Sequence, residues 1–239
     1  PVLAESARLY DRLLAGRAFE FTEAATATTA QHFLAQYYDR TAIPALALAQ
    51  ADHDAGLLSD AQTHRIAAAA WTLTEELETV VEDELALAAD GPAEDGDTSL
   101  VGNGMLDGVG RRIAVMAAQT RLDEAAAQML CQALKAEGAE AVLLPPRAGL
   151  PQALGTFSPE TLLLVTLDGS IAASLDLHLR QIRRRLPGTR LGIAQWSDPD
   201  ATDTSPRRKA SADFTARGME AVFAEAFAAP DATPARVPA

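Results

Sequence analysis

The chain has 239 residues, enough for two domains that each bury a core of their own. It is acidic, with a formal net charge of -13, and so lacks the positive field that attracts phosphate backbones. We therefore expect no nucleic-acid partner. The single cysteine, Cys131, cannot form an internal disulfide, which fits a reducing compartment. Since there is no run of 18 or more apolar residues, we expect a soluble, cytoplasmic protein.

Residues 4–88 show helical periodicity nearly throughout. The pattern predicts one helix that ends at Gly16, a second over 19–36, a third over 37–55 and a fourth that begins at Ser59 or Asp60. Pro44 is expected to kink or bound the third helix, because proline has no backbone N–H to donate. Four antiparallel helices are the economical packing for these lengths, so we predict a four-helix bundle over residues 1–89.

Residues 90–110 are rich in Gly, Asp and Ser and lack apolar periodicity, which predicts a mobile linker. Beyond it, short apolar segments alternate with amphipathic ones. We predict strands over 112–118, 140–144, 161–167, 190–195 and 213–215, and helices over 122–137, 149–154, 171–186 and from Met219 to Phe227. This alternation predicts an α/β domain over 111–230, a doubly wound, Rossmann-like parallel sheet covered on both faces, followed by a disordered tail over 231–239.

Open α/β sheets bind ligands at the carboxyl ends of their strands. We expect the bundle to pack over these ends through the face that bears Trp71 and Leu77. The candidate ligand-binding residues lie in the loops there and on the fourth predicted helix: Arg121, Asp123, Thr166, Asp168 and Trp71. The alternatives are an ion-pair network at the loop rim and core packing of Trp71. No nucleophile, base and orienting group come together, so we expect no catalytic residue and no enzyme.

Two further groups of residues have an ordinary structural explanation. His53 and His64 flank the turn before the fourth predicted helix, but their spacing matches no helical pair that faces one metal, and no metal site is predicted. A cluster of arginines closes the helix predicted over 171–186, where cations stabilise the helix dipole: Arg180, Arg183, Arg184 and Arg185. The alternative is a basic patch that faces an anionic membrane surface or a protein partner.

The two-part layout resembles the cobalamin-binding modules, in which a helical bundle precedes a doubly wound α/β domain. In that family the loop after the first strand carries Asp-x-His-x-x-Gly, whose histidine binds cobalt. The three motif positions read Arg121, Asp123 and Ala126 here. The resemblance thus implies the fold without the axial ligand, and we expect neither cobalamin nor another cofactor. Asp123 is expected at the carboxyl edge of the sheet, where it would cap a helix that starts near Glu124.

A second resemblance covers most of the chain. Residues 9–16, LYDRLLAG, and 37–46, YYDRTAIPAL, are similar to cytosolic tails of some bacterial membrane permeases, among them the autoinducer-2 exporter-like family. Those tails look like degenerate cobalamin-binding modules and end the fourth strand with a tryptophan, as Trp196 does here. The resemblance implies a non-catalytic regulatory or interaction domain at the inner face of the plasma membrane.

The partner implied by that resemblance is the transporter portion of the same polypeptide, of which this chain would be a piece, or another protein. A homo-oligomer remains open. The alternative function is a sensor that binds a small molecule, a corrinoid or another ligand, in the cleft between bundle and sheet.

Overall fold

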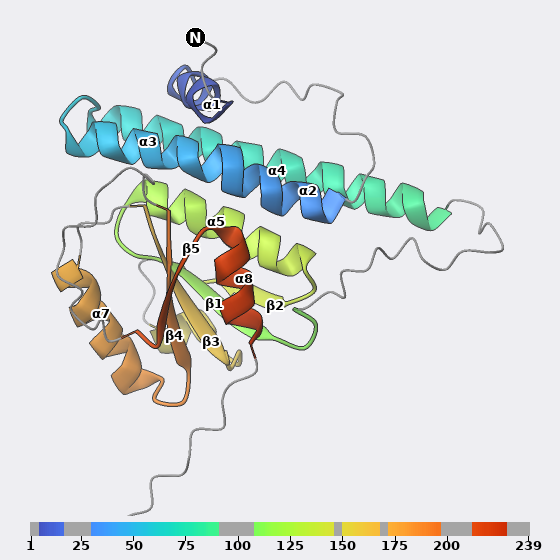
Figure 1. Ribbon diagram of the computed structural model, residues 1–239, viewed down its shortest axis with the longest axis vertical. Coiled ribbons are helices and arrows are strands. Elements are labelled where there is room, and N and C mark those ends of the chain that lie inside the picture. The colour runs from blue at the N-terminus through green and yellow to red at the C-terminus, as the bar shows by residue number, and fades with distance from the viewer. Residues whose placement is uncertain are drawn as a thin grey trace, which may run out of the picture.

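The computed structural model describes residues 5–16, 30–90, 108–145, 150–167, 172–196 and 212–228. The helical half consists of α1 (Glu5–Leu14), α2 (Ala30–Tyr37), the π-helical segment η1 (Tyr38–Ala42), α3 (Ile43–Asp54) and α4 (Asp60–Asp90). The α/β half consists of β1 (Arg112–Ala117), α5 (Arg121–Ala136), β2 (Glu140–Leu143), α6 (Leu150–Leu154), β3 (Thr161–Thr166), α7 (Ala172–Arg185), β4 (Arg190–Gln195), β5 (Phe214–Arg217) and α8 (Met219–Phe227). Figure 1 shows the helical half stacked on α5.

The five strands are all parallel and lie in the order β2-β1-β3-β4-β5. This order confirms the predicted α/β class and its doubly wound, Rossmann-like sheet. The ends of the five strands lie within two residues of their predicted positions. Among the described residues, no helix combines the length and the apolar character that crossing a membrane requires.

Successive residues of each strand point to opposite faces of the sheet, and both faces are buried. On one face Ile113, Val115 and Val165 belong to the core beneath α5. On the other face Ala114 and Leu164 pack with buried side chains of α7. All six residues of β3 are buried, which explains why this strand reads as one apolar run.

The second and third predicted helices form one continuous rod, because η1 joins α2 directly to α3. The predicted break at residue 37, and the antiparallel pairing of these two helices, are therefore wrong. Pro44 lies at the beginning of α3, immediately after the π-helical turn. In an α-helix its ring would clash with the carbonyl of Arg40, and the wider π turn relieves this contact. Residues 19–29 lie outside the described part of the chain.

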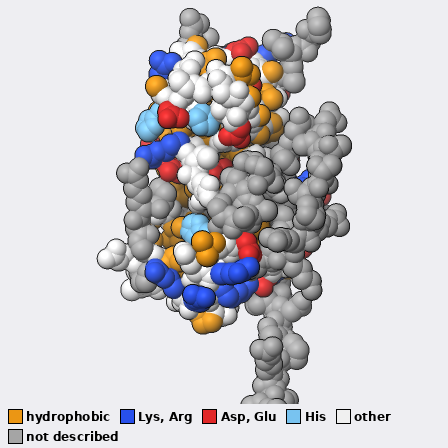
Figure 2. All heavy atoms as spheres, turned by 90° about the vertical axis from the view of Figure 1, so that its left-hand side faces the viewer, with side chains coloured by type: hydrophobic (Ala, Val, Ile, Leu, Met, Phe, Trp, Pro, Cys, Tyr) orange, Lys and Arg blue, Asp and Glu red, His pale blue; other side chains and the backbone are white. Residues whose placement is uncertain are grey.

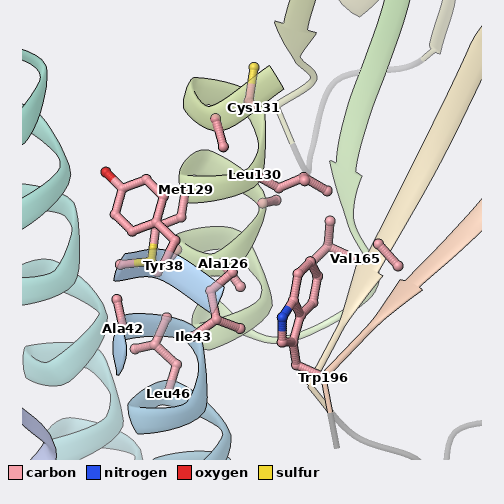
Figure 3. Close-up of a cluster of buried hydrophobic side chains, with 14 of the residues drawn as sticks. Tyr38, Ala42, Ile43, Leu46, Ala126, Met129, Leu130, Cys131, Val165 and Trp196 are labelled. Carbon is pink, nitrogen blue, oxygen red and sulfur yellow. The ribbon is translucent and has the colours of Figure 1, made fainter. Parts of the chain in front are cut away.

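The helical half packs mainly on α5. The prediction placed it over the carboxyl ends of the strands, through the face that bears Trp71 and Leu77, and this is wrong for most of the interface. Residues Tyr38, Ile43 and Leu46 of the helical half meet Ala126 and Met129 of α5 in one buried cluster (Figure 3). Many positions on α5 are alanine, so the neighbouring helices can approach closely. The apolar core therefore runs without interruption from the helical half into the α/β half.

The predicted linker and tail fall largely outside the described residues. Asp90 ends α4, and residues 108–110 form a turn in front of β1. In that turn the N–H of Gly108 donates to the carbonyl of Glu137, over 3.2 Å. A Cβ atom at Gly108 would lie 2.7 Å from the same carbonyl oxygen, so only glycine fits this close approach.

Candidate functional site

The strand order reverses between β1 and β3, and Asp123 fills the crevice at this switch point. Its side chain is fully buried. One carboxylate oxygen accepts hydrogen bonds from the backbone N–H groups of Gln119 and Thr120, at 3.1 and 2.9 Å. The other accepts from the N–H of Leu167, just after β3, at 2.8 Å. Asp123 therefore ties the loops after β1 and β3 together where open α/β sheets normally receive a ligand.

Asp123 also belongs to the first turn of α5, in a different role from the one expected. The helix begins at Arg121, and its N-cap is Thr120, whose hydroxyl accepts from the N–H of Asp123. Asp123 bonds back to the N–H of Thr120, which completes a capping box. The prediction that Asp123 is itself the cap of a helix starting near Glu124 is wrong, because the helix starts three residues earlier.

Burial and hydrogen bonding act on this carboxyl group in opposite directions. Burial raises the pKa of Asp123 above its ordinary value, while the backbone N–H groups of Thr120, Leu167 and Gln119 lower it. All three partners are N–H donors, and the carboxylate of Asp123 accepts from them through both of its oxygens. The side chain is also fully buried, so a ligand at the surface does not reach this carboxylate.

Two other candidate residues of this edge, Arg121 and Thr166, are described by the structure. Arg121 forms an ion pair with Glu124 at 2.9 Å, with its side chain 42% exposed, which fits the rim ion pair weighed in the sequence. Thr166 is buried at the end of β3, beside Gln195 of β4 in the sheet register. Asp168 lies outside the described residues.

Asp39, on η1, closes a second part of the carboxyl edge. Its carboxylate accepts from the indole N–H of Trp196, just after β4, at 3.1 Å, and from the backbone N–H of Met219, at the start of α8, at 2.7 Å. Gly218, with φ at +78°, lets the chain pass close by, since a Cβ atom there would lie 3.3 Å from the same oxygen. Asp39 is not among the predicted site residues, because its partners lie far along the chain and nothing in the neighbouring sequence indicates them.

A third part of the edge, at the ends of β1 and β2, holds a pocket of about 200 Å³. It lies between α4, α5 and the sheet, and its lining is mainly apolar: Trp71, Ala117, Glu124, Leu143, Leu144 and Pro145. Trp71 lines this pocket and also packs against the core, so its position is compatible with both roles weighed for it in the sequence. Among the lining residues that the structure describes, Glu124 is the charged one.

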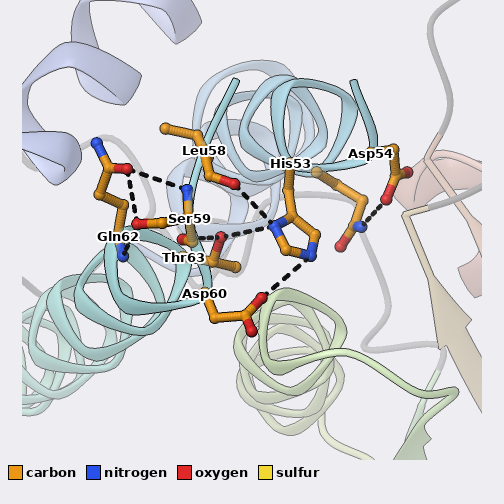
Figure 4. Close-up of polar contacts among 8 residues, drawn as sticks. His53, Asp54, Leu58, Ser59, Asp60, Gln62 and Thr63 are labelled. Carbon is orange, nitrogen blue, oxygen red and sulfur yellow. Dashed lines mark hydrogen bonds and ion pairs between the residues drawn. The ribbon is translucent and has the colours of Figure 1, made fainter. Parts of the chain in front are cut away.

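The turn between α3 and α4 is held together by His53 (Figure 4). Its Nδ1 lies 3.3 Å from the carbonyl oxygen of Leu58 and 3.3 Å from the hydroxyl of Thr63. Its Nε2 lies 3.8 Å from Asp60, and His64 is exposed. No group of three potential metal ligands occurs in the part of the chain that the structure describes. These contacts give His53 a structural role in the turn.

Figure 2 shows the arginine side chains gathered low on the face that α7 forms. Several of them are engaged within the protein. Arg183 pairs with Asp213 at 2.7 Å, and Arg180 pairs with Asp176 one turn earlier on the helix. Much of the positive charge on this face is thereby neutralised, and the remaining arginines of the last turn stabilise the helix dipole.

Comparison with known proteins places few constraints on this chain. No family model matches it, and no curated protein matches it. Among solved structures, it is similar to a protein described as a novel cobalamin-binding protein from Desulfitobacterium hafniense DCB-2, with a TM-score of 0.35 and 11% identity over 94% of this chain and 97% of that one. None of these comparisons supports the resemblance to permease tails.

Proposed function

We propose that this protein is a non-catalytic regulatory or interaction domain on a Rossmann-like scaffold. The observation that carries the proposal is the state of Asp123, whose two carboxylate oxygens are bound to three backbone amides across the switch point. A cofactor tail would need the space and the donors that this side chain already uses. Asp39 supports the same reading at β4 and β5, because it fastens the helical half over those strand ends.

The attachment to a membrane transporter is the more specific part of the proposal and rests on the sequence resemblance alone. The coding sequence on either side of these 239 residues tests it. If a region with several membrane spans is encoded in the same frame, deletion of this domain should change the rate or the regulation of transport while the membrane region still inserts. If no such region is found, the transporter part of the proposal is withdrawn.

A second candidate is a small-molecule sensor, which the pocket beside Trp71 favours. The corrinoid version of this idea requires far more room, since a pocket of about 200 Å³ is smaller than those that hold drug-sized ligands. Purified protein incubated with cobalamin and then desalted should therefore be colourless. Visible absorbance that stays with the protein would favour the corrinoid sensor over the interaction domain.

A further inference from the structure

We infer that the pocket beside Trp71 binds a small organic cation: an apolar body close to a benzene ring in size that carries an ammonium group. The inference rests on the regulatory role proposed above, for which such a molecule would be the effector. It goes beyond that role by naming the chemical class of the ligand. Three properties of the pocket carry it, namely its size, its rigidity and its charge.

The size of the pocket limits the ligand to a small molecule. Its volume is about 200 Å³, and most of its walls are apolar side chains. An engineered apolar cavity of roughly 150 Å³ stays dry and binds benzene, so this pocket has room for one ring and a short arm. Ala117, at the end of β1, contributes little more than a methyl group and leaves this space open.

One side of the pocket is formed and held by the sheet. Ala117 and Leu143 end two strands that pair with each other in parallel. The ladder continues one residue further, because the N–H of Leu144 donates to the carbonyl of Val115, at 2.8 Å. A ligand that enters this site does not have to order this side of the pocket first, which lowers the entropic cost of binding.

The charged groups around Trp71 favour a cation. Glu124 lines the pocket with its side chain 16% exposed, and only one of its oxygens is bound to Arg121, at 2.9 Å. Glu75 is exposed one turn further along α4, on the helix face of Trp71. Among the described residues, Glu124 and Glu75 thus place negative charge near Trp71, and Arg121 is bound to one oxygen of Glu124.

An indole ring attracts cations through its π face, and a low-dielectric pocket strengthens that attraction. The N-terminal dipole of α5 would favour an anion at this place, but Asp123 and Glu124 in its first turn already compensate it. An ammonium group placed between Glu124 and Trp71 would be attracted by both the carboxylate and the indole ring. The apolar body of the ligand would then contact the leucine and proline side chains of the pocket.

The test compares two probes with the same phenyl ring and two-carbon linker but opposite charge, 2-phenylethylamine and 3-phenylpropionate. The indole N–H resonance of Trp71 is followed by NMR during titration of each probe into the full-length protein. We expect the amine to shift this resonance and to bind about tenfold more tightly than the carboxylate. Equal affinity for the two probes, or no response of Trp71 to millimolar amine, would overturn the inference.

Three variants locate the site. Glu124→Gln should reduce the preference for the amine to less than about threefold, because the charge is removed while the shape is kept. Leu143→Trp should fill the pocket and abolish binding of both probes, and its thermal unfolding curve shows whether it is folded. The matched control is Glu137→Gln, at the other end of α5, which should bind as the wild type does.

The outcomes separate this inference from the proposed function. If the amine does not bind, a regulatory domain that acts through protein contacts alone still stands. If the amine binds with the expected preference and the neighbouring coding sequence encodes no transporter, the ligand assignment stands and the transporter attachment fails. An unchanged preference in Glu124→Gln would refute the assigned position of the ammonium group.

Discussion

The carboxylate of Asp39 accepts a hydrogen bond from the indole N–H of Trp196, which is 157 residues away in the chain, over 3.1 Å. The same oxygen accepts from the backbone N–H of Met219 at 2.7 Å. Trp196 is 7% exposed and Met219 is 3% exposed, so water has little access to replace the carboxylate at either donor. One oxygen of the helical half thus holds the ends of β4 and β5 in place.

Asp39→Ala should lower the free energy of unfolding by about 3 kcal/mol, because two largely buried donors lose a charged acceptor. Urea denaturation at neutral pH measures this loss. The control is Asp11→Ala, an exposed carboxylate on α1, which should change stability by less than about 0.5 kcal/mol. A loss of less than about 1 kcal/mol for Asp39→Ala would mean that water satisfies both donors.

Asp123→Ala should cost about 3 kcal/mol, more than the ~1 kcal/mol of a simple helix cap, because three backbone donors lose their acceptor. Asp123→Asn should also destabilise, although it is nearly isosteric. Its NH₂ group would face donors on one side of the site, either Leu167 or the pair Gln119 and Thr120. Chemical denaturation of both variants checks this, and a fully stable Asn variant would contradict the hydrogen-bond assignment.

Asp123→His should not create a cobalamin site. The imidazole cannot accept from three backbone amides at once, and the neighbouring residues Arg121 and Ala126 still differ from the cobalamin motif. The variant is incubated with cobalamin, desalted and examined for visible absorbance, with the wild type beside it. Tight binding by this single variant would show that the switch point opens easily, which the proposed function does not allow.

The three tyrosines should make the protein unfold in alkali. Burial raises the pKa of Tyr37 to about 12. Burial and the hydrogen bond to Asp52 raise the pKa of Tyr10 to about 12. Burial also raises the pKa of Tyr38. The folded state keeps phenol protons that the unfolded state releases near pH 10. This contribution to stability is complete below pH 10 and is lost as the pH rises toward 12.

Phenolate absorbance and far-UV circular dichroism, recorded over the same pH range, test this coupling. All the tyrosines of the chain belong to this group, so the two signals should change together in one transition above pH 10. Tyr37→Phe should move that transition to higher pH. Ionisation of most tyrosines near pH 10 with the helical signal intact would contradict the prediction.

Cleavage between the two halves should leave them bound to each other. The buried hydroxyl of Tyr38 donates to Gln132 of α5, and the side-chain amide of Gln132 donates to the carbonyl of Thr74 on α4, at 3.1 Å. A protease site inserted within residues 91–107 gives a defined cut. The two fragments should co-elute in gel filtration and separate only in denaturant. Elution as two free fragments would show that the shared core contributes little.

The strands and helices of the α/β half could be predicted because each one has a characteristic local sequence pattern. Buried parallel strands such as β3 appear as continuous apolar runs, and the helices between them have one apolar face. The position of Asp123 at the sheet edge followed from the same segmentation. Its role in the capping box could also have been read, since Thr120 and Asp123 have the spacing of that motif.

The errors concern features that depend on distant parts of the chain. The sequence around Asp39 does not indicate its role, because its partners Trp196 and Met219 follow 157 and 180 residues later. The join between α2 and α3 was missed for a related reason. A π-helical turn adds one residue to a helix without any characteristic composition, so periodicity around Pro44 suggested an interruption. The pocket beside Trp71 arises only when three elements meet.

The π-helical turn also sets the angular phase of the helix that precedes it. In an α-helix each residue advances the chain by about 100°, so deleting one residue from η1 would rotate α2 by about that angle relative to α3. Tyr38 and Asp39 could then no longer point at Gln132 and Trp196 at the same time. The orientation of α2 on the α/β half thus depends on a single extra residue. Deleting one residue from η1 would rotate α2 and leave the composition of the chain nearly unchanged.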